Sequence, residues 1–548
     1  MEVKRRECGD AGQPLEREIL REVLADVVDD AVDPLLVLEP VRAAGHGGNS
    51  SPSSCMLPAM SDFDVVVIGA GNAALAAAVS AREQGARRVA VLEKAPRALR
   101  GGNTHYSGGL LRLAFDRPDD LRALVPEAER EVSGFYAGVE PYPQRLFMAD
   151  LLRVTDGRTD PELAELLIGR SYDTACWMAR RGIEMEPAVS LSAVKVGDTI
   201  TWSPGAVIRA RHEGVGLSAM WFRIAERAGV EIRYDTAVVR LHQDRAGRVT
   251  GVGVQAPDGF AEITAGAVVL ACGGFEANPE WRARYLGRPW DHAKVRGTRY
   301  NTGDGLRMAT ELGALPHGQW TGCHSTPIDA EAPPHGDRKL TDKTNRLSYP
   351  YGLLVNTRGL RFFDEGEDFQ FYTYAKLGGI ILNEPGGIGW QIFDAKVMHL
   401  LEGRYKTGTP VMADSLDALV GKLPLDQAAC RRTLEGYNRA VTEGRFDPTV
   451  RDGLGTRGLP LAKSNWAQRL DAPPFAAYPV TGGITFTFGG VRVNDRAQVI
   501  STSWAPIPGL YACGEMVGGL FHGNYPGGTG LMSGAVFGRL AGAHAAGA

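Results

Sequence analysis

The sequence predicts an α/β protein with a parallel sheet and at least one further domain. Residues 64–93 run as an apolar strand, a glycine turn, a helix and a second apolar strand, which is the first crossover unit of a parallel sheet. The chain has 548 residues, more than one hydrophobic core normally serves, so two domains are expected. The residues are 44% hydrophobic and 23% charged, as in ordinary globular proteins.

The charge balance and the cysteines exclude several classes of protein. A net charge of -4 gives no overall attraction to nucleic acids or anionic membranes, and no apolar run reaches the ~18 residues that a membrane span needs. The seven cysteines contain no CxxC pair and no ligand spacing. We therefore expect no metal site, no transmembrane segment and a reduced, cytoplasmic setting.

The first 59 residues form a separate leader. A charged stretch at 16–32 has the pattern of an amphipathic helix, and residues 43–60 have the composition of a flexible linker. The leader lacks the basic start and apolar centre of a secretion signal. Because Met60 precedes the first strand directly, we expect the leader to be either disordered or an over-long translation of the gene.

The first crossover carries a dinucleotide-binding pattern. Residues 64–68 form the buried strand, and Gly69, Gly71 and Ala74 make a GxGxxA turn into a helix. Small residues there let the backbone turn tightly and approach a pyrophosphate, which the helix N-terminus attracts. Glu93 ends the second strand 22 residues after Gly71, where a carboxylate meets ribose hydroxyls. A turn that binds nothing is the alternative, and this unit alone does not distinguish NAD from FAD.

A second glycine-rich segment distinguishes the two cofactors. The segment "RGGNTHYSGGLLRLAF" at 100–115 has paired glycines on both sides of Asn103 and Thr104. So many positions without side chains are costly to order unless a bulky group lies against the backbone. The pattern resembles the flavin-contacting loop of the fumarate reductase and succinate dehydrogenase flavoprotein superfamily, which implies FAD.

Further motifs carry the same resemblance to the end of the chain. They include "LACGGFEAN" at 270–278, "YNTGDG" at 300–305 and "NYPGGTGLMSGAVFGR" at 524–539. Within the superfamily, these stretches resemble the tricarballylate dehydrogenase branch most. Standing alone, "TGDG" would be only a capped helix start. The resemblance implies a Rossmann-like FAD-binding domain of the glutathione reductase type at 60–317 and 487–548, interrupted by an α+β capping domain at 318–486.

The cofactor-binding residues predicted from the first turn and from the resemblance are spread over the chain. They are Gly69, Gly71, Asn72, Ala73, Ala74, Glu93, Lys94, Gly101, Gly102, Asn103, Thr104, Gly108, Gly109, Val238, Gly273, Gly274, Asp304, Glu515, Gly530, Leu531 and Ser533. By the resemblance, Val238 lies against the adenine and Glu515 accepts hydrogen bonds from the ribityl hydroxyls. No second GxGxxG occurs in a strand-turn-helix context for a nicotinamide cofactor.

The substrate side departs from the resembling family. Flavin dehydrogenation moves a hydride from one carbon to N5 while a base takes a proton from the neighbouring carbon. His324 matches the family histidine near a substrate carboxylate, with a backbone-bonded structural histidine as the alternative. Gln370 stands where an arginine is expected, Thr485 and Phe486 replace a histidine, and Tyr525 replaces an arginine.

These replacements predict an aromatic pocket with little positive charge. The aromatic residues concerned are Phe369, Phe371, Tyr372, Tyr374, Phe486, Phe488 and Tyr525. Burying a di- or tricarboxylate without charge partners costs several kcal/mol per ion, so a bulkier and less anionic substrate is expected.

The loop around Tyr525 also resembles that of 3-ketosteroid dehydrogenases. By that match, the Tyr525 hydroxyl and the N–H of Thr529 would hold a carbonyl oxygen. Tyr372 or Tyr374 would be the base, helped by a cation such as Lys376 or Arg361. The alternative is that the aromatic run around these tyrosines only fills the core of the capping domain.

The sequence therefore predicts an FAD-dependent dehydrogenase that desaturates a C–C bond next to a carbonyl or carboxylate. A reductase of an activated alkene and a tricarballylate dehydrogenase proper stay open, as does a flavoprotein that only senses. Without haem or iron–sulfur cysteine patterns, electrons are expected to pass to an external acceptor such as oxygen, a quinone or an iron–sulfur protein.

Overall fold

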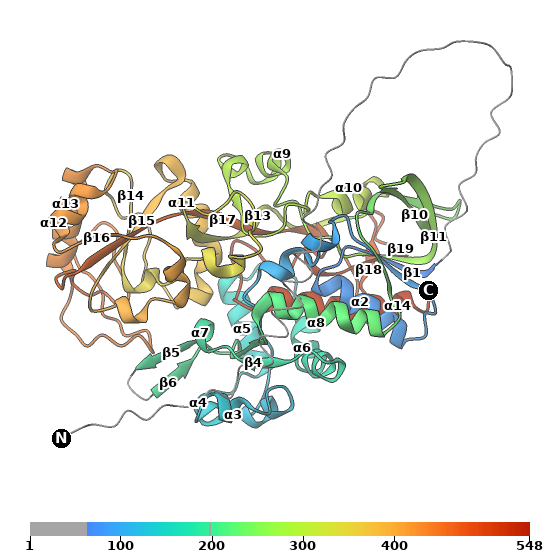
Figure 1. Ribbon diagram of the computed structural model, residues 1–548, viewed down its shortest axis with the longest axis horizontal. Helices are drawn as coiled ribbons and strands as arrows, with labels where there is room; N and C mark the ends of the chain where they lie inside the picture. The colour runs from blue at the N-terminus through green and yellow to red at the C-terminus, as the bar shows by residue number, and fades with distance from the viewer. Residues whose placement is uncertain (1–62, 197–198) are drawn as a thin grey trace, which may run out of the picture.

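The computed structural model describes residues 63–196 and 199–548 (Figure 1). The leader predicted over residues 1–59 lies outside these residues. Within them, no helix has the length and apolar character needed to cross a bilayer.

A mostly parallel sheet forms one end of the protein. In the described residues it has eight strands, with β18, β19, β11, β1, β2 and β8 in spatial order and β10 and β9 continuing from β11. Their bounds are β1 Phe63–Ile68, β2 Val89–Leu92, β8 Glu231–Arg233, β9 Ala237–Gln243, β10 Val249–Ala256, β11 Gly259–Leu270, β18 Gln498–Ile500 and β19 Pro506–Ala512. The central strand β1 is parallel to both β2 and β11, and Val66 pairs with Ala90 and Val268. Such a strand is covered on both faces, which explains its unbroken apolar run. The predicted α/β class is confirmed.

Two helices from opposite ends of the chain pack side by side on this sheet. They are α2 Asn72–Glu83 and α14 Thr529–Ala545 (Figure 1). Gly538 and Gly542 of α14 lie against the backbone of α2, where an added Cβ on Gly542 would stand 2.0 Å from the Ala77 carbonyl oxygen. Glycines four residues apart lie on one face of a helix, so they let the two backbones approach closely.

Two long antiparallel strands lead from this sheet to the other end of the molecule (Figure 1). They are β13 Pro316–Asp329 and β17 Phe475–Val491, and β12 Lys294–Val295, β14 Leu353–Asn356, β15 Gly389–Asp394 and β16 Val411–Ala413 complete their sheet. The predicted domain boundaries at 318 and 486 fall inside β13 and β17. The division into domains stays a prediction.

The far end of the protein has its own core. Helices α12 Leu416–Lys422 and α13 Gln427–Ala440 cover β14, β15 and β16 there. The buried side chains include Leu353, Val355, Trp390, Ile392, Leu419, Val420, Leu434 and Tyr437.

Further elements connect these parts. The helices are α3 Ala128–Glu131, α4 Phe135–Gly138, α5 Gln144–Val154, α6 Pro161–Arg181, α7 Val189–Ser192, α8 Glu213–Arg227, α9 Pro279–Trp281, α10 Asp304–Glu311 and α11 Tyr374–Leu382. The strands are β3 Leu110–Leu111, β4 Met185–Pro187, β5 Ala193–Val196, β6 Thr199–Trp202 and β7 Ile208–Ala210.

Candidate active site

A cavity opens where β1, β2 and β11 end and where α2 and α14 begin. The carboxyl ends of parallel strands are where α/β proteins bind their ligands. The predicted cofactor residues that line it are Gly69, Gly71, Asn72, Ala73, Glu93, Lys94, Gly102, Asn103, Thr104, Val238, Gly273, Asp304, Glu515, Gly530, Leu531 and Ser533. Segments from all along the chain therefore meet at one cavity.

Two helix N-termini point into this cavity. The N-cap residues of α2 and α14 are glycines and offer no side-chain acceptor, although the Thr104 hydroxyl accepts from the Asn72 N–H of α2 at 2.9 Å. The first N–H groups of a helix need acceptors and carry partial positive charge. The start of α2 fits a pyrophosphate, and the start of α14 fits the electron-accepting edge of a flat ring.

The end of β2 offers a carboxyl group to the cavity. Glu93 is buried, and one of its oxygens accepts a hydrogen bond from the Ala95 N–H at 2.7 Å. Burial raises the pKa of Glu93, so hydroxyl donors from a bound ribose would stabilise its ionised form. The neighbouring Lys94 is already paired, with Asp304 at 2.6 Å and Thr302 at 2.7 Å. These residues fit the adenosine half of FAD.

Five predicted cofactor residues lie behind the lining instead. Ala74 is fully buried in α2, and Gly101 lies against Ser218. The others are Gly108 beside Asp342, Gly109 against the backbone of Glu213, and Gly274 against Thr487 and Glu515. These glycines let neighbouring segments approach one another, so their part in the site is indirect.

The other end of the cavity is aromatic. Phe486, Phe488, Phe521 and Tyr525 line it, and Phe486 contacts Tyr525 with the ring centroids 5.4 Å apart. Behind them His324 stacks on Phe486 at 5.0 Å. Of the seven aromatic residues predicted for the pocket, Phe486, Phe488 and Tyr525 line the cavity, and the other four do not.

Two phenols meet at this end. The Tyr374 hydroxyl donates a hydrogen bond to the Tyr525 hydroxyl at 2.8 Å. Burial raises the pKa of Tyr525, and burial together with Tyr525 raises the pKa of Tyr374 well above its ordinary value. Tyr525 lines the cavity, and Tyr374 reaches the cavity through Tyr525.

The sequence predicted that the Thr529 N–H lies beside the Tyr525 hydroxyl, and the structure directs it elsewhere. The Thr529 N–H is directed to the Pro526 carbonyl oxygen at 3.3 Å, and the Thr529 hydroxyl donates to the same oxygen at 2.6 Å. The backbone of Gly528 hydrogen-bonds the Tyr525 hydroxyl and lowers its pKa. The backbone N–H group beside Tyr525 is therefore that of Gly528, and it is directed to the Tyr525 hydroxyl.

One arginine lines the cavity beside the phenols, and sequence analysis missed it. The positive charge of Arg296 lowers the pKa of both Tyr374 and Tyr525. Both cations proposed from their closeness in sequence are paired elsewhere, Lys376 with Glu367 at 2.7 Å and Arg361 with Glu365 at 2.5 Å. Arg296 comes from a distant segment, so spacing gave no signal for it.

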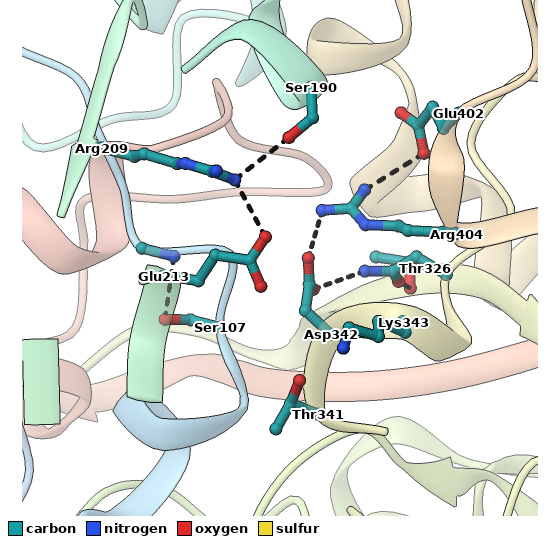
Figure 2. Close-up of polar contacts among 12 residues, drawn as sticks. Ser107, Ser190, Arg209, Glu213, Thr326, Thr341, Asp342, Lys343, Glu402 and Arg404 are labelled. Carbon is teal, nitrogen blue, oxygen red and sulfur yellow. Dashed lines mark hydrogen bonds and ion pairs between the residues drawn. The ribbon is translucent and has the colours of Figure 1, made fainter. Parts of the chain in front are cut away.

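Arg296 shares its counter-ion with another arginine. Asp342 accepts from Arg296 at 2.6 Å and also pairs with Arg404. Figure 2 shows the ion pair of Asp342 and Arg404 opposite a second ion pair, formed by Glu213 and Arg209 at 2.9 Å. Arg404 also pairs with Glu402 at 3.2 Å, so the two guanidinium groups face two carboxylates, and Arg296 is the member of this cluster that lines the cavity.

His324 is neutral in this environment. It is 1% exposed, and burial followed by the charge of Arg296 lowers its pKa well below the ordinary value. Its Nδ1 is buried and has no hydrogen-bond partner in the described part of the chain. His324 therefore supplies shape and an unpaired ring nitrogen behind the cavity wall, and no positive charge for a carboxylate.

Tyr372 lies away from the cavity. Its hydroxyl donates to Asp150 at 2.8 Å, and the guanidinium of Arg153 lies 4.4 Å from its ring centre. Phe369 packs on Trp466 with the ring centroids 5.3 Å apart. The aromatic run is helical rather than extended, since a 3-10 turn at Gln370–Tyr372 precedes α11. This geometry separates Tyr372 from Tyr374.

Known proteins resemble this chain along most of its length. The FAD binding domain family matches residues 64–531. The fumarate reductase (cytochrome) of Shewanella frigidimarina is 28% identical over 488 residues, which cover 88% of this chain and 77% of that protein. The 3-oxosteroid 1-dehydrogenase of Mycobacterium tuberculosis is 26% identical over an alignment 578 residues long. That alignment covers 88% of this chain and 98% of the relative.

A solved structure supports the fold. The 3-ketosteroid Δ1-dehydrogenase of Sterolibacterium denitrificans, in complex with 1,4-androstadiene-3,17-dione, superposes with a TM-score of 0.68 at 20% identity and covers 89% of this chain and 99% of its own. The cofactor is FAD, and the protein is an oxidoreductase acting on C–C or C=C bonds. The closer resemblance to tricarballylate dehydrogenases stays a prediction. The chain belongs to the FAD binding domain family, within the fumarate reductase and succinate dehydrogenase flavoprotein superfamily.

Proposed function

We propose that the protein desaturates a C–C bond next to a ketone carbonyl. The observation that carries this proposal is the hydrogen bond of 2.8 Å between the buried hydroxyls of Tyr374 and Tyr525 at the aromatic end of the cavity. A phenol donates well to a carbonyl oxygen, and a second phenol beside it can accept a proton when ionised.

The charges of the cavity favour a ketone over a carboxylate. Among the described residues, the cationic side chains that line it are Lys94 and Arg296, and both are paired with aspartates at 2.6 Å. A substrate carboxylate would have to compete with Asp342 for Arg296 or stay unpaired, and an unpaired buried charge costs several kcal/mol. A neutral carbonyl requires only hydrogen-bond donors.

Tyr525 forms the carbonyl site in this proposal. The Tyr525 hydroxyl donates to the carbonyl oxygen and polarises it, which makes the neighbouring carbon acidic, and the backbone hydrogen bond from Gly528 to the Tyr525 oxygen strengthens Tyr525 as a donor. In their hydrogen bond Tyr374 is the donor, so the hydrogen of the Tyr525 hydroxyl is available to the carbonyl oxygen, and an ionised Tyr374 no longer donates to Tyr525. Tyr374 is then free to accept the proton from the substrate.

Tyr374 acts in its ionised form. Two features favour ionisation, the charge of Arg296 and the position of Tyr374 as the first residue of α11, where a helix favours negative charge. The surrounding rings of Phe486 and Phe521 exclude water from the reacting carbons. FAD, when bound, supplies the hydride acceptor.

The reverse reaction, reduction of an alkene next to a carbonyl, is the second candidate. The same residues would return a proton from Tyr374, and the similarity to a fumarate reductase supports this direction. The electron partner in either direction is external, and oxygen, a quinone and an iron–sulfur protein remain the candidates. A cytoplasmic location, favoured by the cysteine pattern, belongs to the same proposal.

Anaerobic mixing tests the reaction class. The oxidised holoenzyme is mixed with saturated ketones, steroids, succinate and tricarballylate, and the flavin absorbance is followed. Bleaching by ketones or steroids with formation of the unsaturated product is expected. Bleaching by tricarballylate alone would instead assign the protein to tricarballylate dehydrogenation. If no compound bleaches the flavin while enones reoxidise the dithionite-reduced enzyme, the reductive direction holds.

The pH dependence of the oxidation should depend on Arg296. Because the pKa of Tyr374 is raised, its ionised fraction is small at neutral pH, so kcat/KM for oxidation should increase as the pH rises. Replacing Arg296→Leu removes a charge that lowers this pKa, so the rising limb should move to higher pH. The control Lys376→Leu removes a cation that is paired with Glu367 outside the cavity lining and should leave the limb in place. An identical pH profile in Arg296→Leu and the wild type would contradict this role.

A further inference from the structure

Two buried carboxyl groups meet beside the cofactor cavity. Glu276 follows the turn at the end of β11 and is 0% exposed, and Glu515 lines the cavity just after β19. The two side chains lie within hydrogen-bonding reach of each other. If both were ionised, like charges would face each other in a buried site, which is strongly unfavourable.

The hydrogen bonds of Glu276 leave one of its oxygens without a donor. The Oε1 atom accepts from the side-chain amides of Asn103 and Asn301, each at 2.6 Å. The Oε2 atom is buried and has no partner among residues 63–196 and 199–548. A proton on Oε2 would satisfy that atom and donate to Glu515.

Glu515 is the better anion of the pair. Its Oε1 accepts from the Thr487 N–H at 2.6 Å and the Thr487 hydroxyl at 3.0 Å, and the backbone of Gly274 also hydrogen-bonds it. Several donors stabilise an ionised carboxylate. By contrast, burial and the charge of Glu515 raise the pKa of Glu276 well above its ordinary value.

Among the described residues, the other ionisable groups around Glu276 do not pair directly with its carboxyl oxygens, although the charge of Arg282 attracts the ionised form. Arg282 directs its guanidinium to backbone carbonyl oxygens, among them that of Glu276 itself at 2.5 Å. Cys323 is a neutral thiol because burial raises its pKa well above the ordinary value. Glu276 thus has amide donors on one oxygen, no donor on the other, and the Glu515 carboxylate within hydrogen-bonding reach, which is the environment of a carboxylic acid.

We propose that Glu276 is a positioning residue that carries a proton and donates it in a hydrogen bond to Glu515, so that the pair has a single negative charge next to FAD. Glu276 fixes the orientation of the Glu515 carboxylate and leaves its second oxygen for the cofactor. This inference depends on the FAD site and not on the proposed substrate, so the two can fail separately.

Infrared spectroscopy of the holoenzyme tests where the proton is. At pH 8 the wild type should show the C=O stretching band of a buried carboxylic acid, shifted in D2O, and Glu276→Gln should remove it. The matched control Glu402→Gln removes another buried carboxyl, which is outside the cavity lining and pairs with Arg404, and it should leave the Glu276 band unchanged. A wild type without such a band, or a band that persists in Glu276→Gln, would overturn the proposal.

The affinity for FAD tests the positioning role. The amide of Glu276→Gln can still donate to Glu515, so FAD should bind within about threefold of the wild-type affinity. Glu276→Leu has a similar size but no donor, and it should bind FAD at least roughly tenfold more weakly, the usual effect of losing a hydrogen bond to a charged group. Equal losses of affinity in the two variants would contradict the donor role of Glu276.

Discussion

Replacing Tyr374→Phe is expected to lower the rate of substrate oxidation by roughly a thousandfold, within the range that general bases contribute. The substitution removes only a hydroxyl, and the ring can keep its contact with His324, whose centroid lies 5.0 Å away. FAD should therefore stay bound, with its visible spectrum nearly unchanged. The measurement is the rate of flavin bleaching after rapid anaerobic mixing with the substrate.

Tyr372→Phe is the matched control for this variant. It removes the Tyr372 hydroxyl, which donates a hydrogen bond to Asp150 and lies away from the cavity. Its flavin bleaching should stay near the wild-type rate, while its melting temperature should fall because the Asp150 carboxylate loses a donor. If Tyr372→Phe slows bleaching as strongly as Tyr374→Phe, the assignment of the base to Tyr374 is wrong.

Tyr525→Phe is expected to lower turnover about a hundredfold, the usual effect of losing one donor to a developing oxyanion. The loss should appear in kcat more than in KM, because this hydrogen bond strengthens as negative charge develops on the carbonyl oxygen. Steady-state kinetics on the purified holoenzyme measure both constants. Unchanged turnover would remove Tyr525 from the mechanism.

The Tyr374→Phe, Tyr525→Phe double variant tests whether the two phenols act as a unit. Groups that depend on each other lose little more together than the more harmful single substitution loses. The double variant should therefore be close to Tyr374→Phe. A loss equal to the product of the two single losses would mean that the hydroxyls act independently.

The FAD site could largely be predicted from the sequence, because its signals are local. Gly69, Gly71 and Glu93 belong to one strand-turn-helix-strand unit whose spacing is fixed by the parallel sheet, and all three line the cavity. The glycines of α14 also carried a signal that was not used. Gly538 and Gly542 repeat at four residues, which indicates close contact with another helix.

The substrate end could not be predicted in the same way, because its residues come together only through tertiary structure. Arg296 and Asp342 are far apart in sequence, and no spacing indicates their ion pair of 2.6 Å. Tyr372 and Tyr374 are equivalent in a sequence pattern, and the change from a 3-10 turn to α11 between them decides which one reaches Tyr525.

A matched pair of substrates tests the central claim most directly. Cyclohexanone and cyclohexanecarboxylate have the same ring and differ in whether a neutral ketone or a carboxylate activates the neighbouring carbon. Under anaerobic conditions the rate of flavin bleaching by each is measured over a range of concentrations. The cavity has a phenol at its aromatic end, and the cations that line it among the described residues are paired with aspartates. The ketone should therefore bleach the flavin much faster than the acid. Faster bleaching by the carboxylate would show that Arg296 or another cation binds an anionic substrate and would contradict the account.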